Sequence, residues 1–168
     1  MAAGDEFIVG LLSPQALTVT DTVQRHPTGA IAWDNRGNDF VYLKGVASTI
    51  HGSAVTYDEN GDTTLLTTTT ILTANRRSES FAVSQSANVA SQWGWYATKM
   101  QVNVNDTYKL AALASAVKGA SLYATATAGY VDDTATEAGR VLGLHLTATA
   151  TGTDGVVTGW RCNFMTTT

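Results

Sequence analysis

The sequence predicts an all-β protein, a sandwich or a barrel of about ten short strands. Three observations predict this fold. Runs rich in β-branched and aromatic residues recur along the chain, turn-forming residues separate them, and charged residues are only 14% of the 168 residues. Thr and Ala are abundant, which is typical of weakly charged β-sheet surfaces. The composition excludes a disordered acidic chain, a coiled coil and a basic protein that binds nucleic acid.

The first 28 residues lack clear periodicity and predict an extended N-terminal arm, whereas residues 29–168 predict a single β domain. Near its start, the arm carries a cluster of large apolar side chains, which soluble monomers rarely leave uncovered. The cluster is therefore the candidate partner-binding site. Its members are Phe7, Ile8, Val9, Leu11 and Leu12.

Turn residues separate the predicted strands of the first half. A turn at 34–39 joins the first two strands, and Asn60-Gly61 is the strongest short signal for a hairpin between the next two. Residues 64–73 are expected to form one long Thr-rich strand. The predicted strands cover residues 30–33, 40–44, 54–57, 64–73, 81–83, 92–98 and 101–104.

The second half predicts strands at 121–126, 139–149 and 156–164, with an Asp154-Gly155 turn before the last. Residues 108–117 have helical propensity. However, residues 113–123 resemble residues 46–56, with three identities, and this favours strand and loop. The similarity suggests two pseudo-repeated halves, about 38–100 and 105–164, although a chance match in an Ala/Ser-rich chain is the alternative.

Residues that could carry out chemistry are scattered. His26, His51 and His145 lack metal-ligand spacing, and Cys162 is expected to pack on a strand as a small hydrophobe. Glycine-rich nucleotide motifs are missing. The sequence therefore predicts no catalytic, cofactor-binding or metal site, and no enzyme.

The acidic loop at 58–62 has carboxylates at alternate positions, as in some calcium sites. In an EF-hand the glycine directly follows the third ligand and a glutamate comes later in the loop. Here Gly61 precedes Asp62, and the next glutamate is Glu79, so a hairpin turn is the favoured interpretation.

The start of the chain is acidic and its apolar run at 8–12 is short, so neither an export signal nor a transmembrane helix is expected. The single cysteine fits assembly in a reducing cytoplasm. With a net charge of −4 and one adjacent basic pair, we expect binding to neither nucleic acid nor membrane.

The tryptophans allow two interpretations. Trp93 and Trp95 lie two apart on one predicted strand, and Trp160 lies opposite Trp95 when the two halves are aligned. They either form the core or make an aromatic contact surface for a protein or a sugar.

Several segments resemble small virion proteins of tailed bacteriophages. An aspartate turn leads into Phe40-Val41-Tyr42-Leu43-Lys44, and a glycine turn then introduces an apolar strand. The resemblance continues, in patches, between Ala30 and Phe164. Its other segments are residues 81–87, 92–95, 118–123 and 128–133.

This resemblance implies a capsid decoration, or cement, protein: an all-β body, often a homotrimer, clamped on the outside of the capsid. It implies the major capsid protein as partner, the virion exterior as location, and capsid stabilisation as function, after assembly in the cytoplasm of the bacterial host. The alternative is a carbohydrate- or host-binding module of a phage head fibre or tail.

Overall fold

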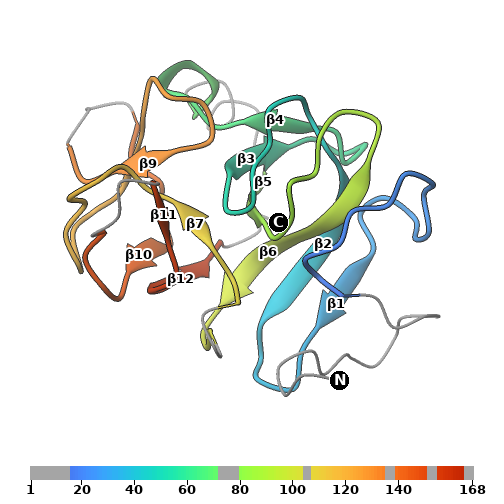
Figure 1. The fold of residues 1–168 in the computed structure, drawn as a ribbon, viewed down its shortest axis with the longest axis horizontal. Helices are drawn as coiled ribbons and strands as arrows, with labels where there is room; N and C mark the ends of the chain where they lie inside the picture. The colour runs from blue at the N-terminus through green and yellow to red at the C-terminus, as the bar shows by residue number, and fades with distance from the viewer. Residues whose placement is uncertain (1–15, 72–79, 104–106, 135–138, 151–154, 165–168) are drawn as a thin grey trace.

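The computed structural model describes residues 16–71, 80–103, 107–134, 139–150 and 155–164 (Figure 1). These residues form twelve strands, and every strand pair is antiparallel. The predicted all-β fold is confirmed. Within the described residues the main sheet does not close into a barrel, so the fold is that of a sandwich.

The main sheet belongs mostly to the first half of the chain. The first-half strands form one continuous row, in which β1 and β4 are the two end strands. In spatial order its strands are β1 (Ile31–Trp33), β2 (Asp39–Lys44), β6 (Trp93–Met100), β5 (Ser80–Ser84), β3 (Ala54–Tyr57) and β4 (Thr63–Leu65).

Strand β6 joins the two halves of the chain. It pairs with β2 along one edge, while β5 and β12 (Trp160–Asn163) share its other edge. Ala97 lies opposite Val83 of β5, and Met100 lies opposite Cys162 of β12. Strand β12 in turn pairs with β10 (Leu144–Leu146). A single eight-residue strand therefore holds both halves in one sheet.

The sheet curls so that the start of β4 reaches the end of β2. Lys44 donates its backbone N–H to Gly61 O at 3.2 Å, and Thr63 Oγ1 donates to Lys44 O at 2.7 Å. Lys44 Nζ also lies 3.1 Å from Asp62 Oδ1. The strands of this curl share the smaller of two core clusters, which comprises Val41, Leu43, Val55, Ala82 and Tyr96.

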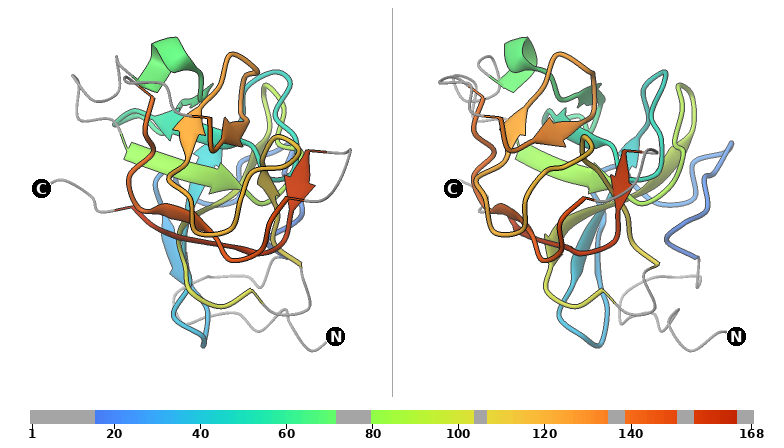
Figure 2. Two further views of the ribbon diagram at one scale, coloured as in Figure 1. Left: turned by 90° about the vertical axis from the view of Figure 1, so that its left-hand side faces the viewer. Right: turned by 60° about the vertical axis from the view of Figure 1, so that its left-hand side comes forward.

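The larger core lies between the sheet and the second half of the chain, which lies against it in both views of Figure 2. Two short two-stranded sheets complete the second half. They are β7 (Leu110–Ala111) with β11 (Val156–Val157), and β8 (Tyr123–Ala124) with β9 (Val131–Asp132). Buried residues of this core come from both halves and include Phe40, Tyr42, Trp95, Leu110, Leu122, Leu144 and Trp160.

The predicted strand at 64–73 is wrong beyond Leu65. Residues 68–71 are helical instead, and residues 72–73 lie outside the described residues. Thr67 and Thr70 cap this turn reciprocally: each backbone N–H donates to the other's hydroxyl, at 2.7 and 3.1 Å. Threonine is favoured in strands, but it is equally a helix N-cap, and here capping prevails.

The predicted strand at 101–104 is also wrong where it is described, since 101–103 are not in a strand. The backbone N–H groups of Gln101 and Val102 donate to Asn38 Oδ1, at 2.8 and 3.1 Å, instead of joining a ladder. Residues 108–117, by contrast, form β7 and turns, as the resemblance between the two halves predicts.

Residues 46–53 and 113–120, part of the predicted pseudo-repeat, adopt the same pair of turns. The first turn closes through a 3.3 Å backbone hydrogen bond in each segment and places Ser48 or Ser115 in the left-handed region, at φ 68° and 77°. The second closes at 3.1 and 3.2 Å around a left-handed glycine. The common backbone supports the repeat in this segment, while repetition of the whole halves stays a prediction.

Candidate functional site

The apolar cluster predicted to bind a partner lies outside the described residues. Phe7, Ile8, Val9, Leu11 and Leu12 all precede residue 16, where the description begins. The later part of the predicted arm, residues 16–28, packs on the domain. Leu17 is buried in the larger core, and Asp21 exchanges two backbone hydrogen bonds with Trp93, at 2.7 and 2.9 Å.

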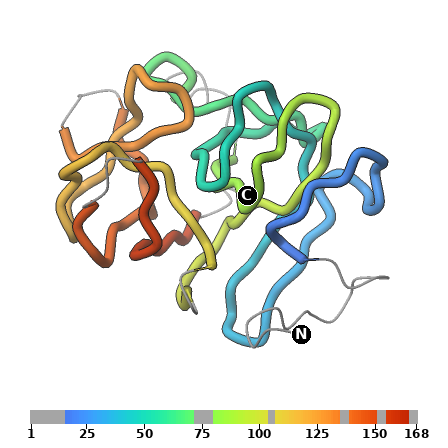
Figure 3. Tube along the Cα trace, viewed as in Figure 1, coloured from blue at the N-terminus to red at the C-terminus, as the bar shows by residue number. Residues whose placement is uncertain are grey.

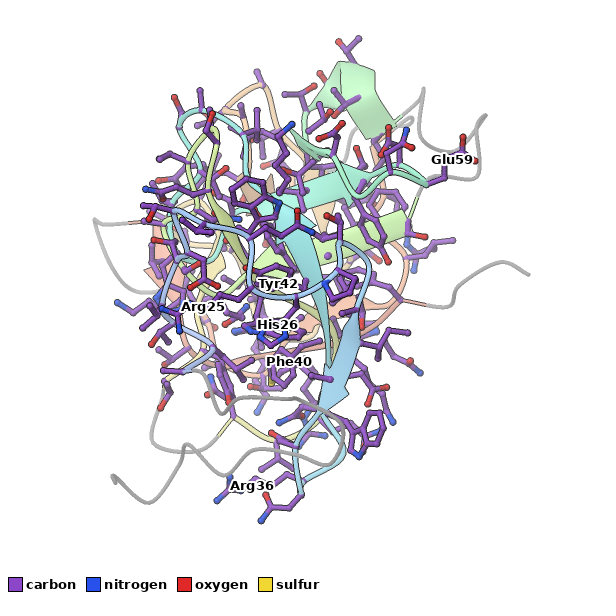
Figure 4. All side chains as sticks on the ribbon, turned by 90° about the vertical axis from the view of Figure 1, so that its right-hand side faces the viewer. Arg25, His26, Arg36, Phe40, Tyr42 and Glu59 are labelled. Carbon is purple, nitrogen blue, oxygen red and sulfur yellow. The ribbon has the colours of Figure 1, made fainter. Side chains whose placement is uncertain are left out.

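A polar cluster anchors this segment to the sheet (Figure 4). The Tyr42 hydroxyl donates to Asp21 Oδ2 at 2.7 Å, and Arg25 Nε lies 2.9 Å from Asp21 Oδ1. The His26 ring packs on Tyr42 and Trp95, with centroids 5.1 and 5.3 Å apart. Burial and the hydrogen bond to Asp21 raise the pKa of Tyr42 to about 12, so the phenol keeps its proton as a donor. The cluster fixes residues 21–26 in place.

The tryptophans divide between core and surface. Trp95 and Trp160 are 0% and 1% exposed, so their interpretation as core is confirmed and their interpretation as a contact surface is wrong. Trp160 Nε1 donates to Tyr108 O at 3.2 Å, which satisfies the buried indole. Trp93 packs, partly buried, against the core. The sequence pattern predicts which side chains share one face of a strand, but it does not predict whether another part of the chain covers that face.

Cys162 lies on β12 with 2% exposure inside the larger core, as predicted. Burial raises the pKa of its thiol well above the ordinary value. It therefore packs as a small apolar side chain and is a poor nucleophile.

The acidic loop is the hairpin turn between β3 and β4. Asp58 Oδ1 accepts hydrogen bonds from the backbone N–H groups of Asn60 and Asp62, both at 3.0 Å. This carboxylate is therefore used to shape its own loop. In the part of the chain that the structure describes, no three His, Cys, Asp or Glu side chains are grouped to hold a metal ion.

The titration of His51 is perturbed by its surroundings. Burial, assisted by the nearby charge of Lys109, lowers its pKa from the ordinary 6.5 to about 4. The folded protein therefore keeps the imidazole neutral at pH values where the unfolded chain is already protonated.

We expect the stability of the protein to fall as the pH decreases from 6.5 to about 4, because the unfolded state then binds a proton that the folded state excludes. His51→Gln should remove part of this decrease in stability. The measurement is the Tm of the variant and of the wild type at a series of pH values between 6.5 and about 4. His145→Gln, at an exposed position of β10, is the matched control. Equal pH profiles for the wild type and His51→Gln would contradict the assignment.

An exposed apolar pair on β1 was not foreseen from the sequence. Ile31 is 66% exposed and Trp33 is 45% exposed, whereas Ala32 between them is 1% exposed. The alternation of large and small residues predicts that both large side chains share a face. Only the sheet order reveals that β1 is an outer strand and that the described residues do not cover this face.

None of the helical segments described is long and apolar enough to cross a membrane. Comparisons of the chain with protein-family models, with curated proteins and with solved structures find no match.

Proposed function

We propose that this protein is a structural virion protein that binds the outside of a tailed-bacteriophage capsid and stabilises it by bridging subunits of the major capsid protein. In this proposal it acts as a homotrimer, without a cofactor and without enzymatic activity, and is assembled in the cytoplasm of the bacterial host. The observation that carries the proposal is the anchoring of residues 17–26. It attaches the chain to the β domain shortly after the apolar cluster of the arm.

The energetics of the arm favour a partner. Burial of each large apolar side chain stabilises by roughly 1.5–3 kcal/mol. Ordering the backbone costs about 1–2 kcal/mol per residue, which offsets most of that gain. The arm therefore needs additional contacts from another molecule to be held. Several such arms on one oligomer would bind a repetitive shell by avidity, so that individually weak contacts give firm attachment.

The second candidate is a carbohydrate- or host-binding module. Burial of Trp95 and Trp160 removes two of the three tryptophans on which that function would depend. Trp33, with 45% of its surface exposed, is the observation that still favours it. Binding of a glycan by the isolated protein, with loss in Trp33→Ala, would favour this second function.

We expect that deletion of residues 1–13 leaves the β domain folded and weakens attachment to phage particles. The deletion removes the apolar cluster but spares the anchor that begins at Leu17. Co-sedimentation with particles measures attachment, and circular dichroism with a thermal melt verifies the fold.

The matched control neutralises the acidic residues of the same segment, with Asp5→Asn and Glu6→Gln, and should attach like the wild type. A truncated protein that decorates particles as tightly as the full-length chain would show that the arm does not bind the capsid.

A further inference from the structure

Strand β1 leaves backbone hydrogen-bonding groups directed away from the sheet. Tyr42 N–H donates to Ala30 O at 2.8 Å, and Asp34 N–H donates to Asn38 O at 3.0 Å. Ala32 lies opposite Phe40 in the same register. Because bonded and non-bonded pairs alternate in an antiparallel ladder, Ala30, Ala32 and Asp34 face β2. The N–H and C=O groups of Ile31 and Trp33 therefore point outward.

The side chains on this edge are apolar and uncharged. Ile31 and Trp33 project from one face of β1, at 66% and 45% exposure, and Ala32 is buried on the other face. Natural proteins usually protect an edge strand with lysine, proline or a bulge. Residues 31–33 contain no such protection, and β1 pairs regularly with β2. In Figure 3 the hairpin of β1 and β2 projects downward at the lower centre of the view.

We propose that the outer edge of β1 binds β1 of a second copy of this chain, antiparallel, around a two-fold axis at Ala32. This register places Ile31 opposite Trp33 of the second copy, and Trp33 opposite the second copy's Ile31. Both residues of each pair have outward-pointing groups, so each pair exchanges both backbone hydrogen bonds. Each pair also brings an aromatic side chain against a β-branched one, a favourable cross-strand combination.

The edge suits a second copy because it is complementary to itself. A two-fold interface uses one patch twice, so the patch must match its own inverted image. The sequence Ile31-Ala32-Trp33 does so with large side chains at both ends and a small one on the axis. A shift by one residue would oppose outward-pointing groups with groups already bonded to β2. Residues 31–33 carry no charge, so the paired strands bring no like charges opposite each other.

The contact is short, and a stable dimer usually buries about 1,600 Å². We therefore expect a weak dimer whose population rises with protein concentration. It would become significant where copies are crowded. The contact is separate from the proposed homotrimer, because a two-fold contact joins two copies and cannot close a ring of three.

Sedimentation of the full-length protein over a concentration series tests the dimer. Trp33→Lys places a charge on each side of the axis and removes the aromatic contact, so it should weaken dimerisation by about thirtyfold or more. Val23→Lys is the matched control, since Val23 is 76% exposed and lies off the strand. Circular dichroism should show both variants folded. A wild type that stays monomeric at millimolar concentration would overturn the proposal, as would a Trp33→Lys variant that dimerises normally.

Cross-linking tests the register. Under oxidation, a mixture of Ile31→Cys and Trp33→Cys proteins should form a disulfide-linked heterodimer, because the two positions face each other across the axis. Each variant alone should cross-link far less. Cys162 is 2% exposed and should not compete. Equal cross-linking in the mixture and in the single variants would overturn this register. Loss of attachment to particles in Trp33→Lys, without any change in self-association, would assign the edge to a capsid strand and reject a second copy.

Discussion

Trp95→Ala should lower the free energy of unfolding by about 3–5 kcal/mol, the usual cost of truncating a fully buried tryptophan. The side chain has no exposed surface and packs against Tyr42 and His26, with ring centroids 5.1 and 5.3 Å apart. Alanine would leave a cavity beneath the segment that Asp21 and His26 anchor. Chemical denaturation, followed by circular dichroism, measures the loss.

The effect of Trp95→Ala should also extend to the anchored segment, because His26 would lose one of its two aromatic contacts. Faster amide hydrogen exchange at residues 21–26 would reveal this. Val23→Ala, on the surface of the same segment, should change stability by about 0.5 kcal/mol or less and serves as the control. Unchanged stability in Trp95→Ala would show that the site collapses without penalty and would contradict a rigid core there.

The local pattern of the sequence predicts most strands of the first half. Strand β3 has the predicted bounds, and β1 and β2 differ from theirs by one residue. Apolar and β-branched runs between turn residues are local information, so they can be read without knowledge of the fold. The Thr-rich run at 64–73 does not form the predicted strand beyond Leu65, because threonine caps helices as well as it builds strands, and only the Thr67–Thr70 pairing decides between the two.

The sequence pattern does not predict which strands pair when they are far apart along the chain. That β12 continues the edge of β6 beyond β5 depends on where the second half docks, and no periodicity encodes this. The same limit applies to candidate binding residues. Trp160 and Trp33 are both strand tryptophans, yet one is in the core and the other on an outer strand. The surface that remains for a partner follows from the strand order.

Asn38→Leu should destabilise the protein by about 3–5 kcal/mol, although leucine and asparagine have similar size. Asn38 is 0% exposed, and its amide nitrogen donates to Asp34 Oδ2 at 2.6 Å and to Val102 O at 2.8 Å. Its oxygen accepts the N–H groups of Gln101 and Val102. One side chain therefore ties the turn of the β1–β2 hairpin to the segment that leaves β6. Leucine would leave these groups without their partners, at a cost of about 1–3 kcal/mol for each group that stays buried.

The loss in Asn38→Leu should follow from the missing amide and not from altered turn propensity, and two variants separate these causes. Asn38→Asp keeps the size and the turn preference but replaces the donor with a second carboxylate beside Asp34, so it should be destabilising near neutral pH as well. Asn60→Leu alters an exposed turn asparagine, whose backbone N–H is bonded to Asp58 Oδ1, and should cost about 1 kcal/mol or less. Urea denaturation of the three variants measures the differences. Equal stability of Asn38→Leu and Asn60→Leu would contradict this prediction. It would mean that the N–H groups of Gln101 and Val102 bind water instead, and that the hairpin does not depend on the Asn38 side chain.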